Sequence, residues 1–251
     1  PWDTTRALEF ALFRTFCVPA ISALLDKTQE FGKRAQKRYD DTDIIVSEMM
    51  EHGYDSERGR AAIARMNAIH GRFKIRNEDF LYVLSTFVFE PVRWTTRFGW
   101  RAMIEKERVA LFHFWREVGA RMHITDIPAT YEEFERYNIE YERANYRFTE
   151  TNHRVGVAVR DMFKSWFPRW TRPLVEQGIY AFMDDNLLLA FGFPKPSPFM
   201  RRVVELSLKS RAWGVRILPR RKRPVLRTEM TQRSYPSGYQ IEKVGPSEVP
   251  K

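Results

Sequence analysis

The chain has 251 residues, of which 43% are hydrophobic and 14% aromatic. A chain of this length and composition can bury one substantial core, which excludes a disordered protein and favours one domain over two. Its formal net charge of +10 predicts attraction to nucleic acid, anionic lipid or acidic proteins. The single cysteine, Cys17, excludes an internal disulfide and a cysteine-ligated metal cluster, and its apolar neighbours predict a buried thiol.

Helical periodicity dominates the chain, and the alternation typical of strands is almost absent. The expected helices cover residues 2–25, 42–52, 56–73, 77–91, 104–122, 130–146, 152–167, one or two between 173 and 191, and a last long one from 198. Pro19 is expected to kink or break the first of these helices, and Pro91 to end the fourth. The expected caps are Asp55 or Ser56, Asn77, Thr130 with Glu133, and Ser197 before Pro198. We therefore predict an all-α fold, a single-domain helical bundle.

Many of the basic residues lie beyond residue 200, in "MRRVVELSLKSRAWGVRILPRRKRP". This segment combines an apolar helical stripe with Arg and Lys, the composition of a helix that lies on a membrane surface. A packed C-terminal helix with a solvated basic face is the alternative interpretation. Periodicity is lost from Pro219 onward. We therefore expect a helical domain over residues 1–218 and an extended basic tail over 219–251.

The longest stretches without a charged residue reach about a dozen residues, short of the ~20 needed to span a bilayer. We therefore expect a soluble, cytoplasmic protein, with peripheral membrane contact if the basic C-terminal helix docks on lipid. Nucleic-acid binding is not expected. The segment "PRRKRP" (219–224) could contact phosphates, but it has no interleaved aromatic residues and belongs to no recognised module.

Signatures of the common enzyme classes are missing, because the chain contains no G-x-x-x-x-G-K-[ST], G-x-G-x-x-G, G-x-S-x-G or H-E-x-x-H. A di-iron carboxylate bundle needs two Glu-x-x-His pairs, and only Glu150 with His153 fits that pattern. His52 and His123 lie near expected helix ends, where an imidazole can satisfy terminal carbonyl groups. His113 is assigned no role.

His70 differs from the other histidines because it shares an apolar helix face with Met66 and Phe73. A rigid helix aims it, apolar neighbours exclude water, and Gly71 removes a side chain beside it. A neutral histidine in such a place is the usual proximal ligand of haem iron. Spacing alone leaves open the alternative of a hydrogen-bonded core histidine.

A family resemblance favours the ligand interpretation. It rests on "KRYDDTDIIVSEMMEHG" (37–53), "RMNAIHGRFKIRNEDFLYVLSTFVFEP" (65–91) and "FHFWREVGARMHITDIPATYEEF" (112–134). Together these segments resemble the haem oxygenases of the MpaB and latex-clearing-protein (rubber oxygenase) family. The most specific part is Arg-x-x-x-Thr followed by a histidine about thirty residues later, here Arg38, Thr42 and His70. The resemblance extends from near residue 2 to about 245.

The resemblance implies an all-α fold around one b-type haem, and cleavage of carbon–carbon double bonds in isoprenoid chains with dioxygen. By position, His70 resembles the proximal iron ligand and therefore a metal-binding residue. Arg38 and Thr42 resemble polar residues on the distal side, with catalytic or haem-contacting roles. The rubber-cleaving branch can place a lysine ligand immediately before the threonine, whereas this chain has Asp41. We therefore predict a distal site open to water or dioxygen, with Asp41 in proton handling.

The two aspartates and a group of aromatic residues also have a purely structural interpretation, and the general base is unassigned. Asp40 and Asp41 also fit a solvated helix start stabilised by the helix dipole. No general base is assigned, because nothing directs the nearest helical carboxylates, Glu48 and Glu51, toward a pocket. Five aromatic residues are numerous enough to line a channel but are more typical of a plain core: Phe73, Phe80, Tyr82, Phe87 and Phe89.

The leading hypothesis is a haem b oxygenase, an oxidoreductase that uses dioxygen at a His-ligated iron on a hydrophobic, isoprenoid-like substrate. The alternative is a non-catalytic binding or assembly subunit that keeps the oxygenase fold and docks through its basic C-terminal segment.

Overall fold

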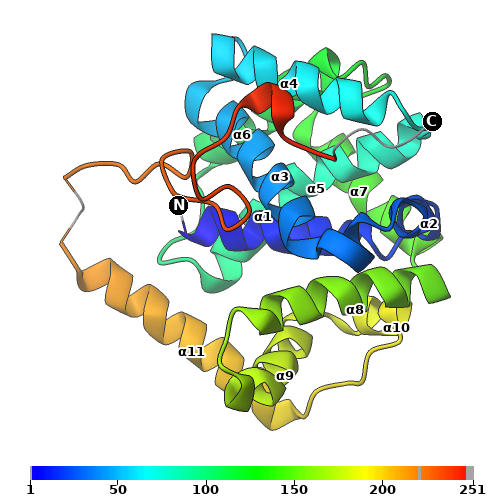
Figure 1. Ribbon diagram of the computed structural model, residues 1–251. Coiled ribbons are helices and arrows are strands. Elements are labelled where there is room, and N and C mark those ends of the chain that lie inside the picture. The colour runs from blue at the N-terminus through cyan, green and yellow to red at the C-terminus, as the bar shows by residue number, and fades with distance from the viewer. Residues whose placement is uncertain (1, 220–221, 247–251) are drawn as a thin grey trace.

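The computed structural model describes residues 2–219 and 222–246, which form one body of eleven α-helices without a strand (Figure 1). The helices are α1 (Trp2–Thr15), α2 (Pro19–Thr28), α3 (Glu30–His52), α4 (Glu57–His70), α5 (Asn77–Phe98), α6 (Glu105–Arg121), α7 (Tyr131–Asn145), α8 (Glu150–Ser165), α9 (Arg172–Phe182), α10 (Asp185–Phe191) and α11 (Pro198–Ile217). The prediction of an all-α chain is confirmed. In Figure 1, α8 to α11 form the lower part of this body, below α1 to α7.

Most helix starts follow the capping chemistry that the sequence predicts. Ser56 accepts a hydrogen bond from the Gly59 amide at 2.9 Å and caps α4. Thr130 and its third following residue form the capping box of α7, and Ser197 caps α11 ahead of a first-turn proline. The prediction for Asn77 is wrong in detail, because Arg76 is the N-cap of α5 and the Asn77 amide bonds the backbone of Thr125.

The prediction that a helix ends near Pro91 is wrong, because α5 continues through it to Phe98. A proline inside a helix costs about 3 kcal/mol through one lost hydrogen bond and a steric clash. The turn beyond it buries Trp94 and Phe98 against Ala7 and Leu208, and fully burying one such large side chain stabilises by about 1.5–3 kcal/mol. Packing against α1 and α11 therefore outweighs the proline.

Helix α3 is longer than the predicted helix over 42–52, and it bends at Arg34, whose backbone (φ −142°, ψ 43°) is not helical. Asp40 and Asp41 lie in its middle and are buried, so the expectation of a solvated helix start is wrong for both. Because both residues are polar, the sequence pattern did not predict that the helix extends through them. The chain that covers them comes from far along the sequence.

We call residues 222–246 the C-terminal segment; Figure 1 shows it crossing the body in orange and red. It bonds a row of acidic side chains on α3. The contacts run from Ser234 N to Asp40 (2.7 Å), from Arg227 Nε to Asp43 (2.7 Å), from Thr228 Oγ1 to Glu51 (2.8 Å) and from Tyr239 OH to Glu48 (2.5 Å). Arg65 on α4 also donates to the Val244 carbonyl at 2.5 Å. The part of the predicted tail that the structure describes is thus packed against α3 and α4.

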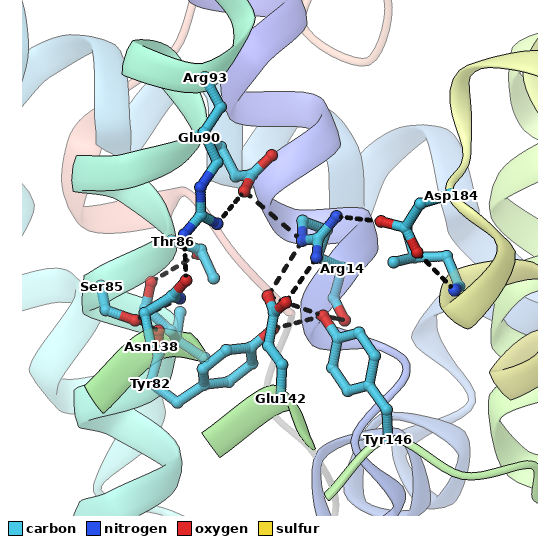
Figure 2. A network of polar contacts seen from close by, with 12 residues as sticks. Arg14, Tyr82, Ser85, Thr86, Glu90, Arg93, Asn138, Glu142, Tyr146 and Asp184 are labelled. Atoms are coloured by element: carbon cyan, nitrogen blue, oxygen red, sulfur yellow. Dashed lines mark hydrogen bonds and ion pairs between the residues drawn. The ribbon is translucent and has the colours of Figure 1, made fainter. Parts of the chain in front are cut away.

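A buried polar network centred on Arg14 joins α1, α5, α7 and the start of α10 (Figure 2). Its guanidinium donates to Glu142 through Nε (3.0 Å) and Nη2 (2.5 Å), and to Asp184 at 2.8 Å. Glu90 lies 3.5 Å away, and the Tyr82 hydroxyl also donates to Glu142. The carboxylates of Glu90 and Glu142 are both largely buried. Arg14 compensates the charge of Glu142 and shares that of Glu90 with Arg93, whose guanidinium lies 2.7 Å from Glu90.

Among the described residues, no single helix is long and apolar enough to cross a membrane. One bent pair, α1 with α2, meets the criteria of length and composition together, with a 97° angle between the two helices. Much of α1 is buried in the body, where it packs against α5.

Replacing Arg14 with methionine should lower the free energy of unfolding by about 3–5 kcal/mol, because the buried Glu142 carboxylate loses its counter-ion. The matched control is Arg154→Met, which removes a bidentate pair with Asp26 on an arginine whose side chain is 54% exposed. That change should cost less than about 1 kcal/mol. Urea denaturation of both variants measures the difference, and equal losses would contradict this account of the network.

Candidate functional site

A cavity of about 440 Å³ lies at the centre of the body, between α1 to α6, α8 and the end of the C-terminal segment. We call it the main cavity. Its volume lies within the ~300–1,000 Å³ typical of small-molecule and cofactor sites. The structure brings all four residues predicted from the sequence to this cavity: Arg38, Asp41, Thr42 and His70 line it.

The walls of the main cavity are predominantly apolar. Of the five aromatic residues considered from the sequence, Phe73, Phe80 and Phe87 line the cavity, whereas Tyr82 and Phe89 are fully buried elsewhere in the core. Three of the five aromatic residues thus line a cavity, and the other two are plain core residues. These walls keep water away from polar atoms that face the cavity, which strengthens electrostatic interactions there.

His70 is the last residue of α4, and the helix aims its ring at the cavity. Its Nδ1 atom is buried and has no hydrogen-bond partner within the described residues. Burial, together with the nearby Arg38 cation, lowers the pKa of His70 to about 4. The ring is therefore neutral at physiological pH, which is the form that ligates metals.

Gly71 does not provide the room that the sequence suggested. It does not line the main cavity, and a β-carbon there would meet the Asn67 carbonyl oxygen of its own helix at 3.2 Å. On the α5 side, the Phe80 ring lies 5.2 Å from the His70 imidazole, centroid to centroid.

Arg38 and Thr42 lie one turn apart on α3, so their side chains share one face. The Arg38 guanidinium donates to the Thr42 hydroxyl and lies 5.6 Å from the centre of the Phe31 ring. Burial lowers the pKa of Arg38, but an arginine stays protonated in proteins. Within the described residues it forms no direct ion pair, and the Asp41 and Glu30 carboxylates, which also line the cavity, compensate its charge only in part.

Asp41 lines the same cavity, and its carboxylate also accepts hydrogen bonds from Lys37 and Tyr235. Lys37 Nζ lies 3.0 Å from both of its carboxylate oxygens, and the Tyr235 hydroxyl donates to one of them. Lys37 also donates to the Gly245 carbonyl at 2.7 Å. This carboxylate therefore links the cavity wall to the C-terminal segment, and its role in proton handling stays a prediction.

The two carboxylates considered as general bases do not line the main cavity. Glu48 is fully buried and accepts two hydrogen bonds from Arg58, at 2.6 and 2.8 Å. Glu51 accepts from the backbone amides of Arg227 and Thr228. Glu48 therefore joins α3 to α4, and Glu51 joins α3 to the C-terminal segment.

Sequence reasoning missed Glu9, a carboxyl group on α1 that lines the main cavity and is 12% exposed. It accepts a hydrogen bond from the Tyr39 hydroxyl and another from Arg6 at 2.7 Å. Burial raises its pKa from 4.5 to about 7, against the opposing effects of these two partners. The available signal was an acidic residue next to Leu8 and one turn before Leu12, within an apolar stripe.

A second missed residue is Trp115 on α6. It lines the main cavity, and its buried Nε1 has no hydrogen-bond partner within the described residues. The other histidines lie outside the cavity lining. His153 bonds the Phe191 carbonyl at 2.7 Å, His52 lies 3.8 Å from Glu48 at the end of α3, and His113 is exposed.

Comparison with known proteins finds one family. The family model described as "ER-bound oxygenase mpaB/B'/Rubber oxygenase, catalytic domain" matches residues 9–217. The ER-bound oxygenase mpaB' of Penicillium brevicompactum is 31% identical over 229 residues, which cover 84% of this chain and 54% of that protein. The ER-bound oxygenase mpaB of Penicillium roqueforti (strain FM164) is 37% identical over 131 residues, or 50% of this chain and 44% of that protein.

A third relative, the ER-bound oxygenase mpaB of Penicillium brevicompactum, is 38% identical over 123 residues, which cover 47% of this chain and 31% of that protein. The chain thus spans about half or less of the length of the curated relatives it matches. The matched family region includes α3 and α4, with every site residue predicted from the sequence.

Replacing Glu9 with glutamine should change how stability depends on pH. The folded chain keeps the Glu9 proton up to about pH 7, whereas the unfolded chain loses it near 4.5, so wild type loses stability as pH rises through this window. Relative to Glu9→Gln, the loss should reach on the order of 3 kcal/mol by about pH 8. Urea denaturation at several pH values measures it.

The control for this prediction is Glu205→Gln on α11, where Lys209 lowers the pKa of an exposed carboxylate. Its effect should be constant above about pH 5, because the carboxylate is charged throughout. A Glu9→Gln profile parallel to that of wild type would contradict the assignment of a neutral Glu9 below pH 7.

Proposed function

The chain belongs to the family of ER-bound and rubber oxygenase catalytic domains, and on that basis we propose that it is a haem b-dependent oxygenase. Family membership indicates an oxidoreductase; the cofactor and the substrate are our proposal. The substrate class is a hydrophobic, isoprenoid-like molecule, with dioxygen as co-substrate. The observation that carries the proposal is the neutral, unpartnered imidazole of His70 at an apolar cavity.

The residues of the main cavity fit a haem group. His70 offers a neutral ring nitrogen as the iron ligand, and the apolar walls suit a flat macrocycle. Arg38 offers a cation in direct contact with no carboxylate of the described chain, which suits a propionate or developing negative charge. Trp115 adds an indole N–H without a partner. Haem would supply the binding and reduction of dioxygen, and the protein supplies position and charge.

The chain's own residues would supply hydrogen-bond donors and proton transfer. Arg38 holds the Thr42 hydroxyl in place by a hydrogen bond, so both donors stay fixed on one face of α3. Glu9 keeps a proton up to about pH 7 at the cavity wall, and Tyr39 fixes its carboxyl group. A proton held near neutral pH can be exchanged with a bound molecule at little cost, so Glu9 is our candidate for proton transfer. Asp41 is the second candidate.

Purified wild-type protein titrated with haem should develop a Soret band at one equivalent, and His70→Ala should lose or strongly shift that band, because the iron ligand is gone. His113→Ala is the matched control, since His113 is exposed on α6 and lies outside the main cavity. Absence of haem binding by wild type, or an unchanged His70→Ala spectrum, would contradict the proposal and favour the non-catalytic subunit.

We also propose that α11 contacts a membrane surface, because it exposes an apolar face to solvent. Its buried residues, Leu208 and Ala212, face the body, while Leu206 is 57% and Trp213 66% exposed. The exposed stripe continues with Phe199, Val203 and Ile217, which follow helical spacing. Figure 1 shows α11 along the edge of the body.

Basic residues flank this stripe. Arg202, Lys209 and Arg216 are exposed and seven residues apart, so they form one row along the helix. An apolar face with a basic row is the pattern of a helix that lies in the interface of an anionic membrane. The names of the relatives, ER-bound oxygenases, are consistent with this proposal.

A double variant, Leu206→Ser with Trp213→Ser, should bind vesicles of mixed phosphatidylserine and phosphatidylcholine at least about tenfold more weakly than wild type. The control replaces two exposed apolar residues outside α11, Ile104→Ser at the N-cap of α6 with Ile139→Ser on α7, and should bind as wild type does. Vesicle co-sedimentation measures both. Equal binding by the two double variants would remove α11 as the docking element.

A further inference from the structure

A second cavity, of about 470 Å³, lies between α1, α3 and residues 223–227 of the C-terminal segment. We call it the side cavity. It adjoins the main cavity, because six residues line both: Glu9, Leu12, Tyr39, Thr42, Val46 and Phe87. His70 and Arg38 line the main cavity only. The two spaces thus share a wall but not the proposed iron ligand.

We propose that the side cavity binds the apolar chain of the substrate and presents it across the shared wall to the main cavity. This inference rests on the proposed function, in which haem fills the main cavity and leaves little room for a long substrate. A chain in the side cavity reaches Thr42 and Tyr39 without displacing anything bound at His70.

The lining of the side cavity indicates an apolar ligand. Residues that belong to it alone include Leu8, Met50, Val225 and Leu226. Apolar walls of this kind stabilise a bound hydrocarbon in proportion to the area removed from water, at about 25 cal/mol per Å². A saturated or unsaturated hydrocarbon chain is therefore the chemistry that these walls recognise.

The charged groups of the side cavity are mostly neutralised within the protein. Arg227 donates to Asp43 at 2.7 Å, and its backbone amide donates to Glu51. Burial holds Glu9 protonated up to about pH 7. Arg223 is exposed at the rim, where its guanidinium stays in water. A bound chain therefore leaves no buried charge without a partner.

Residues 223–227 form part of the wall of the side cavity and lie outside the region that the family model matches. Contacts with Asp43 and Glu51 hold this part of the C-terminal segment on α3. The length and shape of the accepted chain are therefore set in part by a segment outside the matched catalytic domain.

Dodecanol tests the proposal in the full chain, by isothermal titration calorimetry with and without added haem. Met50→Trp fills the side cavity only, and Leu24→Trp, its matched control, fills the main cavity only. Met50→Trp should weaken dodecanol binding by about tenfold or more and leave haem binding unchanged, whereas Leu24→Trp should impair haem binding and spare dodecanol. Haem-loaded wild type should still bind dodecanol.

Wild-type affinity for dodecanol in Met50→Trp overturns the inference, whatever the haem result. Failure of haem binding in wild type instead overturns the proposed function, and the dodecanol comparison then still reports on the side cavity. If Met50→Trp fails to fold, protection of an introduced thiol from alkylation by bound dodecanol tests the same inference. Cys17 is fully buried, so Val225→Cys adds one reactive thiol at the side cavity. Dodecanol should slow its alkylation by about fivefold or more and leave that of Ile104→Cys unchanged, and equal rates overturn the inference.

Discussion

A buried imidazole nitrogen without a hydrogen bond, Nδ1 of His70, is the feature on which the site depends. Leaving a buried polar group unpaired costs about 1–3 kcal/mol, so folded proteins rarely keep one without a use for it. His70 occupies this position because α4 ends at the main cavity, and apolar walls with an adjacent arginine hold it neutral. A neutral nitrogen that no group of the described chain satisfies is prepared for a ligand, and iron in a macrocycle is what its surroundings suit.

Helix α3 performs two tasks on different faces. Its inner face presents Arg38 and Thr42 to the main cavity, and its outer face presents buried acidic residues to the C-terminal segment. Asp41 belongs to both, because it lines the cavity and accepts hydrogen bonds from Lys37 and Tyr235. The C-terminal segment therefore helps to fix the helix that places the polar groups of the site, and it also borders both cavities.

The sequence predicted the features that local patterns determine. Periodicity and caps predicted the all-α fold, and the family resemblance carried by Arg38, Thr42 and His70 predicted a group that the structure brings to one cavity. It could not predict features that depend on distant contacts. Asp40 and Asp41 fitted a solvated helix start because the residues that cover them, Ser234 and Tyr235, lie almost two hundred residues away in the chain. Glu9 was missed for the same reason, since its burial depends on α3 and its own helix pattern is ambiguous. The ligand role of His70 stays a prediction.

The most direct test of that role is chemical rescue in the His70→Gly variant. Removing the imidazole at the end of α4 should leave a space that free imidazole can enter and fill. The account predicts that the haem complex of His70→Gly differs in its absorption spectrum from wild type, and that added imidazole restores the wild-type spectrum. A variant that shows the wild-type spectrum without imidazole would contradict it, as would one that imidazole does not restore.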